Sequence, residues 1–98
     1  MLSDYFDLIV KRLSREDLTV LAILLCEKAT MAKSSMPMEK LQNKSEMSRA
    51  LLRKTVYRLN ANYFIEPEAN NKTQSYYLTS YGEQALNKNI ELEGVKSE

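Results

Sequence analysis

The most informative segment of the chain is residues 48–59, which read SRALLRKTVYRL. At about 100° per residue, as in an α-helix, one side of this segment is apolar and the other is basic. The apolar side carries Leu51, Leu52, Thr55, Val56 and Leu59, and the opposite side carries Arg49, Ala50, Arg53, Lys54, Tyr57 and Arg58. Ser48 stands where its hydroxyl can accept from an amide without an intrahelical partner. The pattern predicts a helix with one packed face and one cationic face, although an ordinary solvated surface remains an alternative.

Positive charge is concentrated around this segment, although the net charge of the chain is only +1. Residues 33–58 hold seven Lys/Arg and two Asp/Glu, a net +5, whereas residues 1–32 carry −1 and residues 59–98 carry −3. Such a distribution is typical of a protein that meets a polyanion with one face. The 98 residues, 44% of them hydrophobic, suffice for one small globular core.

Several functional classes are excluded by what the chain lacks. It has no His and a single Cys, so a zinc site cannot be built from the usual ligands, and no metal or cofactor is expected. Without a nucleophile–base pair, and with only two glycines to form a phosphate loop, the chain is not expected to be an enzyme. Cys26 lies in an apolar run, Val20–Cys26, and is expected to be a buried thiol.

The sequence is that expected of a cytoplasmic protein. It has one unpaired Cys and no basic-then-apolar leader. The apolar run Val20–Cys26 is too short to span a bilayer, so no membrane association is expected.

The first half of the chain reads as three helices before the basic one. They are predicted over residues 3–13, 15–28 and 37–43, with Pro37 in the first turn of the third. Ser14 and Asp17 resemble a capping box, with Asp in place of the usual Glu or Gln. Residues 29–35 form a loop or a short edge strand. Residues 44–47 make the turn into the basic helix, which gives a helix-turn-helix arrangement.

The second half changes to a strand pattern. The basic helix is expected to end near Ala61-Asn62, with Asn62 as a left-handed cap. Residues 63–67 and 74–78 read as the strands of a hairpin, and Thr79 caps a last helix to about residue 92. We therefore predict a mainly α fold with a small β-hairpin wing, a winged helix-turn-helix. One domain covers residues 1–93, and residues 94–98 form a flexible tail.

The residues also support a comparison with a known family. From Met47 to Leu86 the chain resembles the core of MarR-like winged-helix proteins. The spacing from Ser48 through Leu52, Val56 and Leu59 to Phe64-Ile65 matches, as does the segment Tyr77–Gly82, which closes the wing. Glu46 and Tyr63 stand where that family has glycine.

The terminal helices of the chain are shorter than those with which MarR proteins dimerise. In size, architecture and wing length the chain is similar to TubR-type centromere-binding adaptors of plasmid partition.

The resemblance implies which residues would meet DNA. The amino-terminal half of the basic helix would enter a major groove, where Arg49 and Arg53 are the choices for reading bases. Phosphate contacts are expected from Ser48, Lys54, Lys40 and Lys44. Tyr57 would contact the DNA backbone or a thymine methyl, or pack against the protein, and Arg58 could cover the core with its stem. At the wing tip Asn70, Asn71 and Lys72 could reach a minor groove, or form a solvated turn.

A homodimer is expected, because one such domain reads only a few base pairs. Candidate interface residues are Phe6, Ile9, Val10 and Leu13 of the first helix and Leu86 and Ile90 of the last, with packing in their own core as the alternative.

Three functions stay open at this point. The first is a sequence-specific regulator, in particular a repressor, of double-stranded DNA. The second is a partition adaptor that recruits a filament-forming NTPase, and the third is a winged-helix protein-interaction module. The cationic segment argues against the third, so we predict DNA binding, and of the first two functions we favour the regulator because it is the commoner role.

Overall fold

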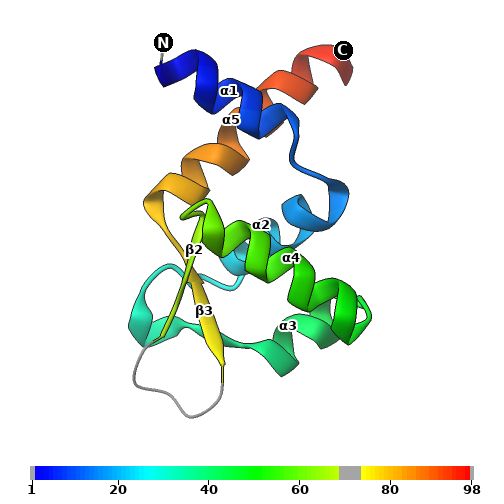
Figure 1. The fold of residues 1–98 in the computed structure, drawn as a ribbon, viewed down its shortest axis with the longest axis vertical. Helices are drawn as coiled ribbons and strands as arrows, with labels where there is room; N and C mark the ends of the chain where they lie inside the picture. Colours follow the sequence, from blue (N-terminus) through cyan, green and yellow to red (C-terminus); the bar gives the residue numbers. More distant parts are fainter. Residues whose placement is uncertain (1, 69–73, 98) are drawn as a thin grey trace.

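The computed structural model describes residues 2–68 and 74–97, and the side chains of residues 5–68 and 74–92. Five α-helices, a 3₁₀-turn and three short strands follow one another in this part of the chain (Figure 1): α1 Leu2–Lys11, α2 Arg15–Cys26, η1 Ala32–Ser34, β1 Met36–Pro37, α3 Met38–Ser45, α4 Arg49–Ala61, β2 Ile65–Pro67, β3 Ser75–Leu78 and α5 Ser80–Ser97. The predicted winged helix-turn-helix fold is confirmed. Over the same residues, none of the helices has the length and apolarity needed to cross a bilayer.

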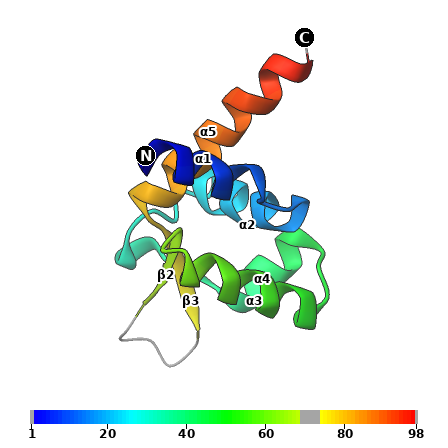
Figure 2. The same ribbon diagram turned by 45° about the horizontal axis from the view of Figure 1, so that its top comes forward.

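Helix α2 is the centre of the core. It contacts α3, α4, α5 and β3, and Figure 2 shows it between the α1–α5 pair and the α3–α4 pair. Val20, Leu21 and Leu24 on α2 are fully buried. This central place explains why the helix is apolar most of the way round.

The prediction of a buried Cys26 is wrong, because its thiol is exposed. Cys26 is the last residue of α2. It lies about 200° around the helix from Leu24, which faces the core, so it points away from the packed side.

The capping box that opens α2 is confirmed. Ser14 Oγ accepts from the Asp17 amide at 3.2 Å, and Asp17 Oδ2 accepts from the Ser14 amide at 2.9 Å. Asp17 Oδ1 also accepts from Arg58 Nη2 at 2.6 Å, and its side chain is only 4% exposed. Arg58 of α4 is therefore tied to the start of α2 by an ion pair, so its role is more specific than covering the core with its stem.

Pro37 does not lie in the first turn of α3, as predicted, but immediately precedes it. Pro37 pairs with Ser75 of β3, and the amide of the next residue, Met38, donates to Gln74 O at 2.9 Å. Helix α3 therefore starts from the edge of the sheet, and it continues to Ser45 rather than ending near Asn43.

Helix α3 ends at Glu46 in the left-handed conformation, with φ 60°. The Glu46 amide donates to Gln42 O at 2.9 Å, and Ser48 then caps α4 by accepting from the Leu51 amide at 3.2 Å. The tight turn of the helix-turn-helix is thus made with Glu46, at a position where the MarR-like proteins that the chain resembles have glycine.

Replacing Glu46 with glycine is expected to stabilise the fold by about 0.5–1 kcal/mol. A left-handed L-residue costs about 1–2 kcal/mol, and the greater freedom of glycine in the unfolded chain offsets part of the gain. Thermal unfolding measures the effect as a Tm increase of a few degrees. Glu46→Ala is the matched control, because it removes the carboxylate but keeps the Cβ. An equal Tm increase in both variants would show that charge, rather than backbone conformation, is responsible.

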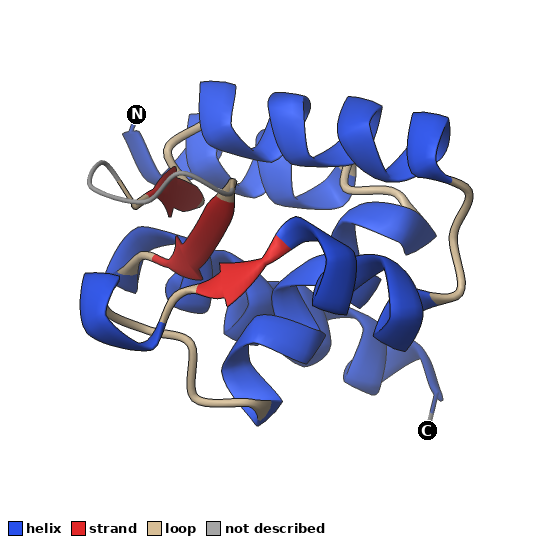
Figure 3. Cartoon of the chain, turned by 90° about the horizontal axis from the view of Figure 1, so that it is seen from below, coloured by secondary structure: helices blue, strands red, loops and turns tan. Residues whose placement is uncertain are grey.

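The wing contains three strands in the order β1-β3-β2, all antiparallel to their neighbours. Met36 pairs with Tyr76, and Ile65 pairs with Leu78. The edge strand considered for residues 29–35 lies instead at Met36–Pro37, after η1. Figure 3 shows this small sheet set among the helices.

The left-handed residue after α4 is Tyr63, with φ 64°, and not Asn62, whose φ is −94°. Asn62 Nδ2 donates to Arg58 O at 3.1 Å instead. The chain thereby makes its reversal one residue later, and β2 begins at Ile65 rather than at Tyr63.

Thr79 caps α5 as predicted, because its Oγ1 accepts from the Gly82 amide at 2.9 Å. Helix α5 continues to Ser97 instead of ending near Leu92. Tyr81 on its first turn lies between Phe6 of α1 and Phe64, with ring centroids 5.2 Å from each. These rings join α1, α5 and the base of the wing.

Two of the residues expected at a dimer interface belong to the core of the chain itself. Val10 and Leu86 are buried, while Phe6, Ile9 and Leu13 are partly buried against that core. Ile90 remains largely exposed, together with Tyr5 and Leu8 of α1, which the sequence pattern did not single out. Of the predicted interface residues, only Ile90 is therefore largely exposed, and Tyr5 and Leu8 add exposed apolar side chains on α1.

Candidate nucleic-acid interface

Helix α4 has the two faces that its sequence predicts. Leu52, Thr55, Val56 and Leu59 are buried, and the Thr55 hydroxyl donates to Leu51 O at 2.8 Å. Leu51 was expected on the packed side but is 39% exposed, since it lies at the boundary between the two faces.

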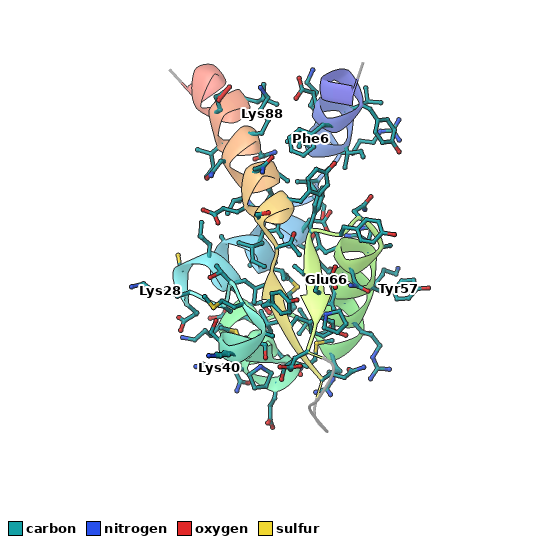
Figure 4. All side chains as sticks on the ribbon, turned by 90° about the vertical axis from the view of Figure 1, so that its left-hand side faces the viewer. Phe6, Lys28, Lys40, Tyr57, Glu66 and Lys88 are labelled. Atoms are coloured by element: carbon teal, nitrogen blue, oxygen red, sulfur yellow. The ribbon has the colours of Figure 1, made fainter. Side chains whose placement is uncertain are left out.

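The basic side of α4 is open to solvent. Arg49, Arg53, Lys54 and Tyr57 are all exposed, and Figure 4 shows Tyr57 pointing away from the body of the protein. Tyr57 is 79% exposed, which excludes the packing role considered for it within this chain. The first turn of α4 has no acidic residue, so the positive end of the helix dipole is not neutralised there.

Arg49 and Arg53 lie one turn apart on the side of α4 that faces the start of β3. Arg53 and Tyr57 form one wall of a groove of about 440 Å³, and Gln74 and Tyr76 form the other. Arg49 lines an adjoining hollow of about 290 Å³ with Glu39 and Gln74. The fold therefore brings both predicted base-reading arginines to one continuous surface beside the wing.

Three polar residues of this surface were missed in the sequence. Gln74 lies between both hollows, and Gln42 accepts from Arg49 Nη1 at 3.2 Å. Asn60 donates from Nδ2 to Ile65 O at 3.0 Å and so fixes β2 against α4. Each depends on contacts between separate elements, for which the sequence offers no periodic pattern.

The two lysines of α3 have different surroundings. Lys40 is exposed, and Figure 4 shows its side chain extending from α3. Lys44 forms an ion pair with Glu27 at 3.2 Å and lines a separate hollow with Ala22, Ile23 and Cys26. Lys44 therefore faces the end of α2 rather than the exposed side of α4.

The remaining predicted contacts are placed as follows. Ser48 uses its oxygen as an acceptor in the cap of α4, which leaves its hydroxyl proton available for a phosphate. Arg58 is bound to Asp17 and is not part of the open basic face. Asn70, Asn71 and Lys72 lie outside the described residues.

Comparison with known proteins agrees with this geometry. No family model matches the chain. The DNA-binding protein TubR of Priestia megaterium is 33% identical over 89 residues, which is 91% of this chain and 88% of that protein. The solved structure of TubR from Bacillus megaterium superimposes with a TM-score of 0.83 at 32% identity, covering 89% of this chain and 97% of that one.

Two more distant structures share the fold. The DNA-binding TubR fragment of Clostridium botulinum gives a TM-score of 0.65 at 18% identity, over 76% of this chain and 94% of that one. The transcriptional regulator MosR of M. tuberculosis gives 0.70 at 19% identity, over 98% of this chain and 69% of that one.

The MarR-like resemblance therefore describes the fold coarsely, whereas the resemblance to TubR extends over nearly the whole chain. These relatives are DNA-binding or regulatory proteins, in agreement with the prediction that the chain is not an enzyme. The chain belongs to the TubR family of DNA-binding proteins.

Proposed function

We propose that this protein binds double-stranded DNA sequence-specifically, as a homodimer, with the amino-terminal half of α4 in a major groove. The observation that carries this proposal is the joint placement of Arg49 and Arg53 on an exposed helix face beside the wing. A guanidinium can donate to both acceptors of a guanine, and residues at the start of a recognition helix are the ones that reach base edges.

The phosphate contacts in this proposal come from Ser48, Lys54 and Lys40. All three are exposed and lie on α4, at its cap, or on α3. Lys44 would contribute only after leaving Glu27, which costs little because both side chains are more than a third exposed. Asn70, Asn71 and Lys72 remain candidates for a minor-groove contact by the wing.

For the biological role we favour a partition adaptor that binds repeated centromere sites and recruits a filament-forming NTPase. The support is membership of the TubR family, whose resemblance here covers nine-tenths of the chain. Repression of nearby genes is the second candidate, and it uses the same DNA-binding step. Loading of several dimers side by side on repeated sites near the gene would support partition, whereas a single site overlapping a promoter would support repression.

Binding is expected to weaken steeply with salt, and Lys54→Ala is expected to make that dependence shallower. Each neutralised phosphate contributes about −0.9 to the slope of log affinity against log salt, so losing one contact changes the slope by about one unit. The measurement is affinity for DNA from around the gene, and for random DNA, across a salt series.

Lys88→Ala is the matched control for this measurement. Lys88 lies on α5, far from Lys40 in Figure 4, and contacts Glu91 at 3.5 Å and Asp7 at 4.0 Å. Its removal should leave the slope unchanged. Weak binding that is equal on both DNAs would argue instead for a protein-interaction module.

A further inference from the structure

Arg49 is held from across the turn of the helix-turn-helix. It is the first residue of α4, and its Nη1 donates to Oε1 of Gln42 on α3 at 3.2 Å. The backbone of α3 is fixed at this point, because Gln42 O accepts from the Glu46 amide at 2.9 Å. The Arg49 guanidinium thus has a partner on α3, a different helix from the one that carries Arg49.

The chemistry of this contact favours recognition of an acceptor pair. Gln has one amide oxygen and one NH₂ group, and here the oxygen already accepts from Arg49. The guanidinium of Arg49 therefore still presents an edge of N–H donors, while Oε1 of Gln42 retains a second lone pair. Two neighbouring acceptors, such as N7 and O6 of a guanine, complement such an edge.

A neutral partner also preserves the charge of Arg49. Glu39 lines the same hollow as Arg49. If Gln42 did not hold the Arg49 guanidinium, this carboxylate would be an available partner for it. Pairing with that carboxylate would neutralise the charge and compete with DNA, whereas the bond to Gln42 does neither.

We propose that Gln42 is a positioning residue for DNA recognition, which acts through Arg49 by directing its guanidinium to base edges. This inference rests on the proposed function. It concerns specificity, because the charge of Arg49 is the same with or without Gln42.

The test is a double-mutant cycle on DNA. Affinities of the full chain, Gln42→Ala, Arg49→Ala and the double variant are measured on a selected site and on its single-base-pair variants. Gln42→Ala is expected to lower affinity for the selected site by about 3- to 10-fold, which is the net worth of an ordinary hydrogen bond, because the contact is exposed. It should lose preference at the same base pair as Arg49→Ala, and the double variant should bind no worse than Arg49→Ala.

Two controls separate positioning from a structural effect. Asn43→Ala changes the next residue of α3, which is exposed and lines the hollow beside Cys26 rather than the one beside Arg49. It should bind like the unaltered protein, and all variants should keep its Tm. Binding to random DNA should be unchanged in Gln42→Ala, because no charge is lost.

Additive losses in the cycle, or an equal loss in Asn43→Ala, would overturn the role of Gln42. If Gln42→Ala kept normal base-pair selectivity while Arg49→Ala lost it, the role of Gln42 would be overturned, but the proposed DNA-binding function would stand. If the unaltered protein bound all DNA equally, the proposed function would fail, and the role of Gln42 with it.

Discussion

Arg53→Ala is expected to lower affinity for the target site by about 10- to 100-fold. One bidentate contact to a guanine is worth about 1–3 kcal/mol of discrimination against other bases. Arg53 is exposed and lies on the wing side of α4, and none of the described residues that line its groove is acidic. Its guanidinium therefore meets DNA without first breaking an internal ion pair, unlike Arg58, which is bound to the buried Asp17.

The variant Arg53→Lys distinguishes base reading from simple charge. It keeps the positive charge but not the planar fork, so binding to random DNA should persist while preference for the target is lost. Arg12→Ala, an exposed arginine next to the end of α1, should change neither affinity. Equal losses on target and random DNA in Arg53→Ala would mean that Arg53 contacts phosphate rather than a base.

The sequence could predict these arginines because they follow a helical period. Four apolar positions at that period place Arg49 and Arg53 on the opposite face, whatever the helix packs against. The capping residues Ser14, Ser48 and Thr79 were predictable for a similar reason, since each acts within three residues of itself.

What the sequence could not predict depends on contacts between distant residues. The ion pair of Arg58 with Asp17 joins residues 41 positions apart, and Gln74 reaches the surface of α4 only through the sheet. Cys26 looked buried because its neighbours in the chain are apolar, yet the α2 face on which it lies is not covered. A local pattern gives the face of a helix, but tertiary packing decides which faces are covered.

The positive-φ residues show a second limit. Glu46 and Tyr63 have φ values of 60° and 64°, although neither is the glycine that such positions favour. Residue preference alone therefore placed the left-handed cap at Asn62, which is a better candidate by type. The surrounding turns, rather than the side chains, impose the conformation at both sites.

Gly82→Ala is expected to destabilise the fold by about 3 kcal/mol, lowering the Tm by roughly 10–20 °C. A methyl group at this position would overlap the carbonyl oxygen of Phe64 and lie 2.9 Å from Leu78 Cδ1. The Phe64 carbonyl cannot simply turn away, because it accepts from the Thr79 amide at 3.1 Å, and the Thr79 hydroxyl holds the preceding carbonyl, Tyr63 O, at 2.7 Å. Relief of the overlap must therefore separate α5 from the base of the wing.

The sign of the effect makes this experiment informative. Gly82 lies in the first turn of α5, and helix propensity alone would make alanine more stable than glycine by about 1 kcal/mol. Asn87→Ala, at an exposed position of the same helix, measures the propensity effect without a clash and should leave the Tm unchanged or slightly raised. A higher Tm for Gly82→Ala would mean that α5 does not approach Phe64 this closely. A large decrease confined to Gly82→Ala would establish that the close approach of α5 to Phe64 stabilises the fold.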